Sequence, residues 1–249
     1  MADATHYVEP PRRSPRRGGI RSVAEFRAGG NRLALGGVIE YTSPGCGIAV
    51  GDVELCYPSP MGAQAEKTRA GIETLEGLGP IFGAYAGIEC WLGGSDFEAD
   101  ANRLLEQGVD RAIEAALNTW LQAATPEAAA ASLVEAVAVA ENTADAEYVG
   151  LPTLVLNRGD AQRAFTSGAL DADGTGNLWT GNGTPVLASS QIEAGSVAIT
   201  GGITVLEGDR TSFRTERLTL NKEYAIAEQV FGLMVDCNYV TVIPVTPAP

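Results

Sequence analysis

Residues 95–126 read SDFEADANRLLEQGVDRAIEAALNTWLQAATP and predict one long amphipathic helix. Ser95 and Glu98 form a capping box, in which each side chain can accept a hydrogen bond from the other residue's backbone amide. Apolar residues then recur at intervals of three and four, which places them on one face of a helix. The pattern stops before Pro126, because proline disfavours helix in the preceding residue. We therefore expect a helix over residues 96–124, about 43 Å long.

The apolar stripe predicts the buried face of this helix. Its main candidates are Phe97, Leu104, Leu105, Ile113, Leu117 and Trp120. Gly108 costs up to about 1 kcal/mol relative to alanine in a helix, so it indicates either a bend or a close approach of another segment. Asp110 and Glu114 lie one turn apart, where a catalytic pair and a solvated face look alike. The high acidic content favours the solvated face.

Helical and strand patterns are mixed along the rest of the chain. The apolar run IFGAYAGIECW, residues 81–91, predicts a buried strand. Thr125 and Pro126 predict the start of a second helix, which ends near Asn142. A short helix is expected over residues 160–167. Further strands are expected over residues 151–156, 186–189, 196–200, 203–206, 214–220, 224–235 and 239–245. This order favours an α+β fold.

Charge is distributed unevenly along the chain. Residues 1–32 contain seven arginines against three carboxylates, a net charge of +4. The whole chain carries −14, which leaves −18 for the other 217 residues. A body this acidic repels nucleic acid, so only the basic tail is a candidate for contact with it. The arginines of the tail that are candidates for a role in an assembly arm are Arg12, Arg13, Arg16 and Arg17.

Three roles are open for this Pro- and Arg-rich tail. Its composition predicts an extended arm without a core of its own, and a solvated arm is the interpretation that composition alone favours. The arginines could instead neutralise DNA phosphates, or pair with carboxylates of a neighbouring chain. Because the body has a surplus of carboxylates, we rank the protein contact above DNA binding.

The residue types needed for catalysis or metal binding are sparse. Cysteines stand at 46, 56, 90 and 237 without a C-x-x-C pair, and the only histidine is His6, in the tail. We expect no catalytic, cofactor or metal site, and interpret the cysteines as small buried apolar groups. Residues 171–176 resemble the start of a calcium loop, but position twelve would be Asn182, so a turn is favoured. No stretch reaches the roughly 18 apolar residues of a membrane span, and we expect a soluble intracellular protein.

Two phrases in the second half of the chain suggest a family. Thr184–Ser189, TPVLAS, precedes glycine-punctuated strands, and Asn221–Glu228, NKEYAIAE, leads into FGLMVDCNYVTVIPV. With the order of elements, these phrases resemble the major capsid proteins of tailed phages, the Hong Kong phage type of fold that encapsulin shells share. The resemblance spans about residues 20–247.

The resemblance implies a fold of five parts. These are an N-terminal arm (1–35), an extended loop (36–80), a peripheral domain with a long spine helix (81–125), an axial domain (126–208) and a return to the peripheral sheet (209–249). It also implies a non-enzymatic major capsid protein that assembles as pentamers, with or without hexamers, into an icosahedral shell around double-stranded phage DNA. The implied partners are further copies of the chain, a portal protein, a scaffold protein where one is used, and DNA bound non-specifically, with no membrane. The implied location is the virion capsid, assembled in the bacterial host cytoplasm.

Two other functions stay open beside this one. An encapsulin-like compartment would share the fold, but it should have a cargo-binding N-terminal helix, which the Pro- and Arg-rich arm opposes. A small two-domain α+β ligand-binding enzyme would place its site in the loop 171–183, which the lack of a structured histidine or a complete phosphate motif opposes. Some capsid proteins of the resembled family crosslink a loop lysine to a neighbour. Lys67 lies in the expected loop, but no partner motif accompanies it, and we expect no crosslinks.

Overall fold

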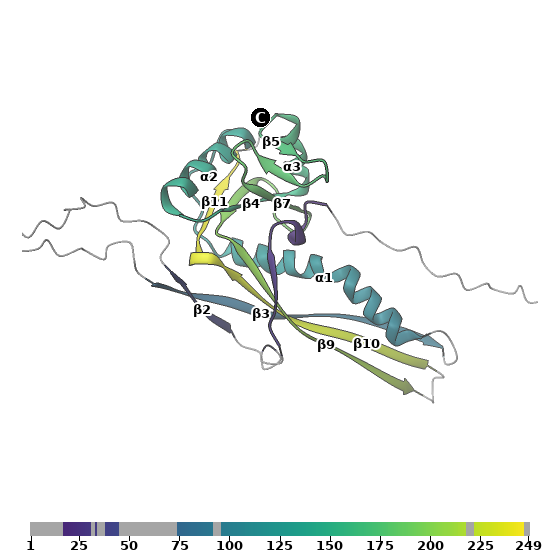
Figure 1. Cartoon of the computed structure of the whole chain (residues 1–249). Coiled ribbons are helices and arrows are strands. Elements are labelled where there is room, and N and C mark those ends of the chain that lie inside the picture. The colour runs from purple at the N-terminus through teal and green to yellow at the C-terminus, as the bar shows by residue number, and fades with distance from the viewer. Residues whose placement is uncertain are drawn as a thin grey trace, which may run out of the picture.

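Two sheets organise the chain (Figure 1). The computed structural model describes residues 17–30, 33, 38–44, 74–91, 96–217 and 222–246. The first sheet has five strands in the order β1-β9-β10-β3-β2 and contains the longest strands of the described chain. Its strands are β1 (Glu25–Ala28), β2 (Val38–Pro44), β3 (Thr74–Trp91), β9 (Ile203–Arg217) and β10 (Lys222–Val235).

The second sheet has six strands in the order β11-β8-β4-β7-β6-β5. Two helices, α2 (Leu133–Glu147) and α3 (Arg158–Thr166), pack against it. Its strands are β4 (Thr153–Asn157), β5 (Leu170–Ala172), β6 (Leu178–Thr180), β7 (Pro185–Ser189), β8 (Ser196–Thr200) and β11 (Val240–Pro244). Only β4 and β7 pair in parallel within this sheet. The mixed helices and sheets confirm the predicted α+β class.

The long helix α1 spans Phe97–Gln122, close to the predicted range. Its N-cap is Asp96, whose carboxylate accepts a hydrogen bond from the Ala99 amide at 3.2 Å. Ser95, the predicted cap, lies outside the described residues. Glu98 accepts from the hydroxyl of Ser212 on β9, so its carboxylate joins the helix to the sheet. The cap therefore lies one residue after the predicted position.

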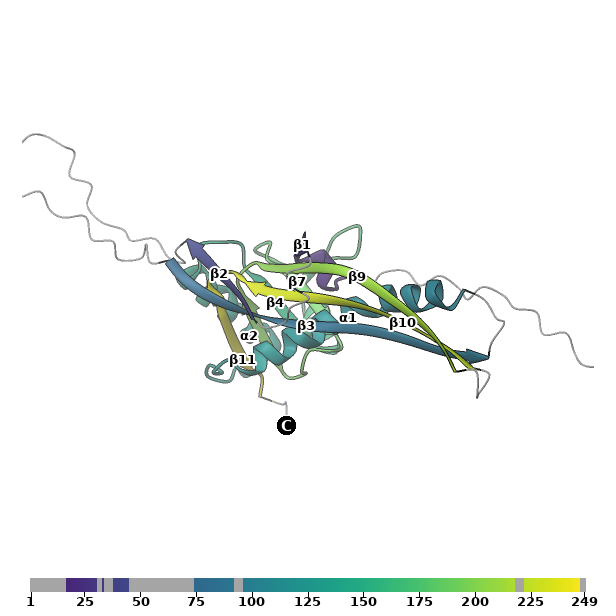
Figure 2. The same cartoon turned by 90° about the horizontal axis from the view of Figure 1, so that it is seen from below.

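Helix α1 lies between the two sheets. Seen from below, the long strands β3, β9 and β10 cross in front of it, and the six-stranded unit lies behind it (Figure 2). One core cluster contains the buried face of α1, residues of β10 and residues of β4, β7 and β8. A second cluster joins the other face of the six-stranded sheet to α2 and α3, where Ala136, Ala140 and Ala144 allow α2 to approach closely.

The second helix begins later than the sequence predicts. Residues 126–130 bond to the last strand instead: the Glu127 amide donates to the Val242 carbonyl and the Ala130 amide donates to the Pro244 carbonyl, both at 2.8 Å. A backbone amide paired across to a strand cannot also close a helical turn, so the prediction of a start at Thr125 is wrong. The helix starts after Ser132, whose hydroxyl accepts from the Glu135 amide at 3.2 Å.

The long strands also differ in extent from the prediction. Residues 203–206 and 214 onward belong to one strand, β9, because its pairing with β10 continues past a bulge. Strand β3 begins at Thr74 and changes partner at Pro80, pairing with β2 before it and with β10 after it. Strand β11 pairs with β8 in the six-stranded sheet, whereas the sequence predicts residues after 209 in the sheet of long strands.

Candidate functional site

Residues 17–22, in the middle of the predicted arm, contact α1 and both sheets. We name residues 17–22 the arm base. It includes a short 3-10 helix, η1 (Ile20–Ser22), and the Ile20 side chain is fully buried. The Ile20 amide donates to Glu114 Oε1 of α1 at 3.1 Å, and the Ser189 hydroxyl of β7 donates to Glu114 Oε2 at 2.5 Å. One carboxylate therefore holds the arm base, α1 and the six-stranded sheet together.

Glu114 is 1% exposed, so the predicted solvated face is wrong for this residue. It lies three residues before Leu117 and seven before Leu121, which places it within the apolar face. That spacing is the sequence signal that could have identified it. Asp110, its predicted companion, is engaged elsewhere and pairs with Arg21.

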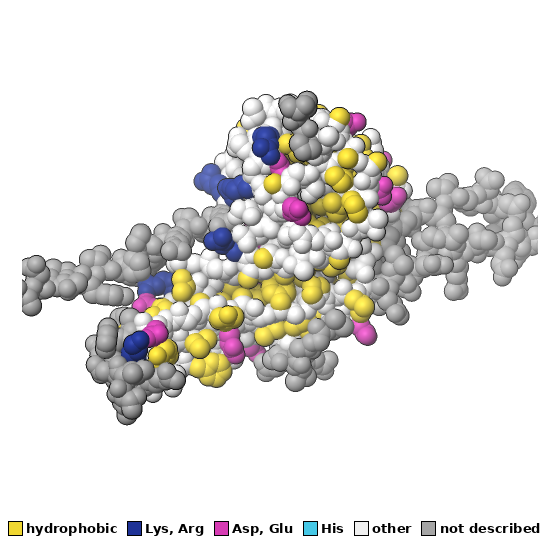
Figure 3. Space-filling view, turned by 180° about the vertical axis from the view of Figure 1, so that it is seen from behind, with side chains coloured by type: hydrophobic (Ala, Val, Ile, Leu, Met, Phe, Trp, Pro, Cys, Tyr) yellow, Lys and Arg dark blue, Asp and Glu magenta, His cyan; other side chains and the backbone are white. Residues whose placement is uncertain are grey.

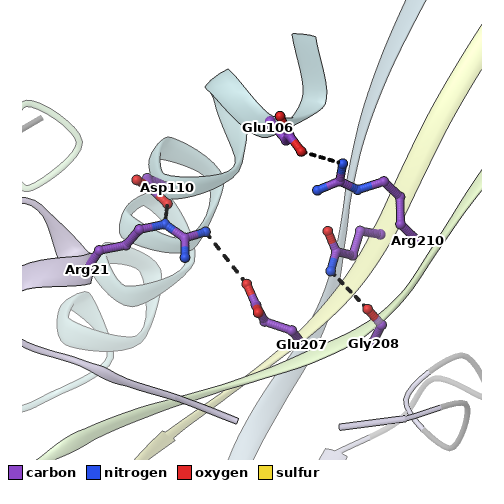
Figure 4. Close-up of polar contacts among 7 residues, drawn as sticks. Arg21, Glu106, Asp110, Glu207, Gly208 and Arg210 are labelled. Atoms are coloured by element: carbon purple, nitrogen blue, oxygen red, sulfur yellow. Dashed lines mark hydrogen bonds and ion pairs between the residues drawn. The ribbon is translucent and has the colours of Figure 1, made fainter. Parts of the chain in front are cut away.

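Arg21 fastens the arm base to α1 and to the sheet (Figure 4). Its guanidinium Nε donates to Asp110 Oδ1 at 2.7 Å, and its Nη2 lies 3.6 Å from Glu207 Oε1 on β9. The guanidinium also stacks over the Phe26 ring, 4.5 Å from the ring centre. Beside it, Arg210 of β9 pairs with Glu106 of α1 at 2.9 Å. These partly exposed pairs orient the elements more than they stabilise them.

Of the four candidate arm arginines, the structure describes one. Arg12, Arg13 and Arg16 lie outside the described residues. Arg17 is exposed and lies against the loop after β5, where a Cβ atom added to Gly176 would come within 2.9 Å of the Arg17 Cδ. The next residue, Gly18, accepts a hydrogen bond from the Ala188 amide of β7 at 2.8 Å. Arg17 also lines a pocket of about 290 Å³ together with Arg158 of α3.

The predicted spine residues divide between a core face and a surface hollow. Phe97, Leu105, Ile113 and Leu117 are buried, and Trp120 packs against the same core while partly buried. Leu104 is 41% exposed and lines a hollow of about 260 Å³ with Tyr85 of β3 and Gly108. A Cβ atom on Gly108 would meet no atom within 4 Å, so no described segment of this chain approaches it closely.

Exposed apolar side chains also lie on the long-strand sheet. Tyr85, Phe213 and Ile226 are 80%, 58% and 43% exposed, and Phe213 pairs directly with Ile226 across β9 and β10. In Figure 3, hydrophobic side chains gather along the lower part of the molecule, which is the part built on the long-strand sheet. Lys and Arg side chains lie along one edge of this part and of the part built on the six-stranded sheet. Apolar surface of this kind is typical of a protein that contacts other chains.

The loop predicted over residues 171–183 instead includes the end of β5 and all of β6, and residues 173–177 form the turn between them. This turn connects the antiparallel strands β5 and β6, and Asp173 accepts hydrogen bonds from the Thr175 hydroxyl, the Asn177 amide and the Thr175 amide at 2.7–2.9 Å. These donors, the Thr175 hydroxyl above all, lower the pKa of Asp173 to about 2. Because the carboxylate already has its partners within the turn, the turn interpretation of residues 171–176 is confirmed.

The described residues can be set against the requirements of a metal site and of a membrane span. They contain no group of three or more His, Cys, Asp or Glu side chains that could hold a metal ion. No helix within the described ranges is long and apolar enough to cross a membrane. Lys67, the candidate for crosslinking, lies outside the described residues, and Lys222 pairs with Glu89 across β10 and β3.

The junction of β10 and β11 is held by tyrosines and a disulfide. The Tyr41 hydroxyl donates to the Val235 carbonyl at 2.5 Å, and the Tyr148 hydroxyl donates to Asp236 Oδ2 at 2.8 Å. Burial raises the pKa of both tyrosines. Cys237, in the short 3-10 helix η4 (Asp236–Asn238), is disulfide-bonded. Its prediction as a simple buried thiol is therefore wrong.

Comparison with solved structures identifies this arrangement. The capsid protein of a native GTA particle aligns with a TM-score of 0.58 and 16% identity, over 99% of this chain and 98% of that chain. A protein of Mycobacterium phage Cain aligns with a TM-score of 0.59 and 12% identity, over 100% and 97%. A virus-like particle from Pyrococcus furiosus aligns with a TM-score of 0.53 and 11% identity, over 88% and 89%.

The chain has the Hong Kong phage type of capsid fold. The predicted fold is confirmed over nearly the full length of the chains compared. No protein-family model matches the sequence, and no curated protein matches it either. At 11–16% identity, the similarity to these structures is one of fold.

Proposed function

We propose that this chain is the major capsid protein of a tailed phage, and that copies of it assemble into an icosahedral shell around double-stranded DNA. The observation that carries the proposal is the capsid fold, which extends over 99% of this chain and 98% of the GTA capsid protein. The proposed partners are further copies of the chain in pentamers, with or without hexamers, a portal protein and, where one is used, a scaffold protein. The proposed location is the virion, after assembly in the host cytoplasm.

The described surfaces support an assembling protein. A shell subunit needs large repeated contacts, and a thin body built on long strands offers more surface than a compact monomer of this size. Tyr85 at 80% exposure and the Phe213–Ile226 pair leave apolar area that burial against another copy would stabilise. The net charge of −14 would let the body of the subunit face DNA without binding it tightly, since like charges repel.

We propose that the subunit is divided into the five parts that the resemblance implies. The arm is residues 1–35, the extended loop 36–80, the peripheral domain 81–125, the axial domain 126–208 and the returning segment 209–249. The two sheets suit this division, because the long-strand sheet carries α1 and the six-stranded sheet carries α2 and α3. Two strands depart from the division: β11 adds to the second sheet, and β9 of the long-strand sheet begins at Ile203, before the boundary at residue 208.

An encapsulin-like compartment is the second candidate. The observation in its favour is the similarity to the Pyrococcus furiosus virus-like particle over 88% of this chain. The two functions differ in what the shell contains. Particles purified after nuclease treatment of the lysate should retain protected double-stranded DNA in the first case and a cargo protein in the second.

Electron microscopy of the full chain tests the proposal. Expressed alone or with its neighbouring phage genes, the protein should form uniform polyhedral particles with five-fold vertices. Analytical ultracentrifugation should show a single large species beside free subunits. A chain that stays monomeric at all concentrations and with all of these partners would refute the proposal.

A further inference from the structure

A pocket lies between the arm base and the face of α3. Its volume is about 290 Å³, and α3 contributes residues one turn apart along a single face. The opposite walls come from the β5–β6 hairpin, from β7 and from Arg17. The lining residues of α3 are Arg158, Ala161, Gln162 and Phe165, and those of the hairpin and β7 are Ala172, Gly176, Leu178 and Ala188.

The pocket concentrates positive charge in an acidic protein. Arg17 and Arg158 both line it, and neither forms an ion pair or hydrogen bond with the described part of the chain. Arg158 is also the first residue of α3, where the helix dipole adds further positive potential. None of the lining residues is a carboxylate, although the chain has 31 Asp and Glu residues.

The nearest carboxylates of this chain are directed elsewhere. Asp160 is 1% exposed, pairs with Arg163 and accepts from the Gly195 amide at 2.8 Å. Asp173 is engaged by the amides and hydroxyl of its own turn. Asp171 precedes the lining residue Ala172 in β5 and therefore points to the opposite face of the sheet. Among the described residues, the two lining arginines therefore have no carboxylate partner.

Hydrogen bonds of the arm base fix the position of Arg17 at the pocket. Gly18 bonds to Ala188 and Ile20 bonds to buried Glu114, so the backbone on the C-terminal side of Arg17 is fixed at two points. The Arg17 side chain lies against Gly176, which has a φ of +84° and no side chain to displace it. The pocket is therefore complete in the free subunit, which lowers the entropic cost of filling it.

We propose that this pocket takes an acidic side chain from a second copy of the chain, with its carboxylate between Arg17 and Arg158. The apolar floor, which includes Leu178 and Phe165, suits the methylene stem of Glu or Asp. Guanidinium groups bind carboxylates through paired hydrogen bonds, and other copies supply carboxylates in surplus. The inference rests on the proposed self-assembly and names one of its contacts.

Charge and spacing favour this occupant over nucleic acid. Binding along a duplex requires a row of cations at the spacing of the phosphates. Here two arginines converge on one pocket, and the third arginine of α3, Arg163, is already paired with Asp160.

Zero-length crosslinking tests the contact in assembled particles. The chain has only two lysines, Lys67 and Lys222, so Arg158→Lys adds a distinctive amine to the pocket while it keeps the positive charge. Particles assembled from a mixture of ¹⁴N- and ¹⁵N-labelled R158K protein are treated with a water-soluble carbodiimide, which joins an amine directly to a touching carboxylate. Mass spectrometry should find the peptide containing position 158 joined to an Asp- or Glu-containing peptide of the other isotope. The matched control is R111K, at an exposed arginine of α1 away from the pocket.

Charge reversal gives a second readout. The double variant R17E/R158E should raise the subunit concentration needed for assembly at least about tenfold at low salt, because it places like charges together. R111E should change this concentration less than about twofold, since an exposed charge outside the contact contributes little. R17Q/R158Q, which removes the charges without repulsion, should give an intermediate effect. Circular dichroism and thermal melting of the subunits confirm that each variant is folded.

The outcomes separate this inference from the proposed function. A wild-type chain that never assembles refutes the proposed function, and with it this contact. Wild-type particles in which R158K forms no crosslink between isotopes, or only crosslinks within one copy, refute the contact alone. The contact is also refuted if the double reversal leaves assembly unchanged and alters only the nucleic acid that the particles retain.

Discussion

Glu114 is a single carboxylate on which three parts of the chain depend. It accepts one hydrogen bond from the arm base and one from the six-stranded sheet, and it is 1% exposed. Within the described residues it has no cationic partner, so the two donors supply its stabilisation. A buried carboxylate of this kind is costly to disturb, because its donors have no access to replacement water.

Replacing Glu114 with alanine should destabilise the subunit strongly. The change leaves the Ile20 amide and the Ser189 hydroxyl buried without an acceptor, at a cost of about 2–4 kcal/mol. E114Q retains an acceptor for the Ile20 amide and should lose less. The free energy of unfolding, measured by urea denaturation of the unassembled subunit, reports both changes.

Glu106 provides the control on the same helix. Its side chain is 62% exposed and pairs with Arg210, so E106A should cost less than about 1 kcal/mol. Equal losses for E114A and E106A would contradict the role assigned to Glu114.

The elements differ in how far local sequence determines them. The range of α1 was predictable because its cap and apolar stripe lie within one continuous segment. The start of α2 was not, because the amides of Glu127 and Ala130 bond to β11, more than a hundred residues away. Local helix propensity carries no information about a hydrogen-bond partner so far away in the sequence. The same limit explains why the two predicted pieces of β9 form one strand, since β10 pairs along both.

Helix α1 contains one residue whose replacement should strengthen it. Gly108 lines a surface hollow, and an added methyl group would meet nothing within 4 Å in this chain. G108A should therefore stabilise the isolated subunit by up to about 1 kcal/mol, because alanine has the higher helix propensity. Thermal melting of the subunit measures this effect.

The same variant distinguishes the two interpretations of Gly108. A bend in the helix at this residue would make alanine unfavourable and lower the melting temperature. A stabilised subunit that assembles poorly would indicate that a second copy approaches the hollow formed with Tyr85 and Leu104. G83A, on the facing strand at another open position of the hollow, is the matched control.

The whole molecule holds its two sheets together through long-range contacts that the sequence does not reveal. The order of elements predicted the α+β class, and the resemblance of that order and of two phrases, residues 184–189 and 221–228, to tailed-phage capsid proteins predicted the capsid fold. The pocket at Arg17 and the joint at Glu114 were not predictable, because each assembles residues from segments far apart in the chain. The disulfide at Cys237 was missed because spacing alone does not pair four scattered cysteines.

The junction between the sheets should weaken at alkaline pH. Burial raises the pKa of Tyr41 and Tyr148 above their ordinary value of 10.0, so the folded state favours the protonated hydroxyls. Their contribution to stability is complete below pH 10 and is lost as the pH rises through the folded-state pKa. The free energy of unfolding should therefore be level between about pH 7 and 9 and fall above about pH 10.

Phenylalanine variants isolate this effect. Y41F/Y148F should lower stability at neutral pH, because the hydrogen bonds to Val235 and Asp236 are lost. The same variant should show a shallower fall at alkaline pH. Y85F, at a side chain that is 80% exposed, should follow the wild-type curve. A double variant with the full alkaline fall would contradict the assignment.

The bond between Gly18 and Ala188 limits how far the chain can be trimmed. Strand β6 covers β7 only at Pro185 and Val186, and beyond them the arm base bonds to the exposed edge. Proteolytic removal of residues up to Arg16 leaves this bond in place. Cleavage a few residues later would remove the arm base from the edge of β7. It would also leave buried Glu114 without its Ile20 donor. A cut that shortens the arm must therefore fall before Arg17 if the fold is to stay intact.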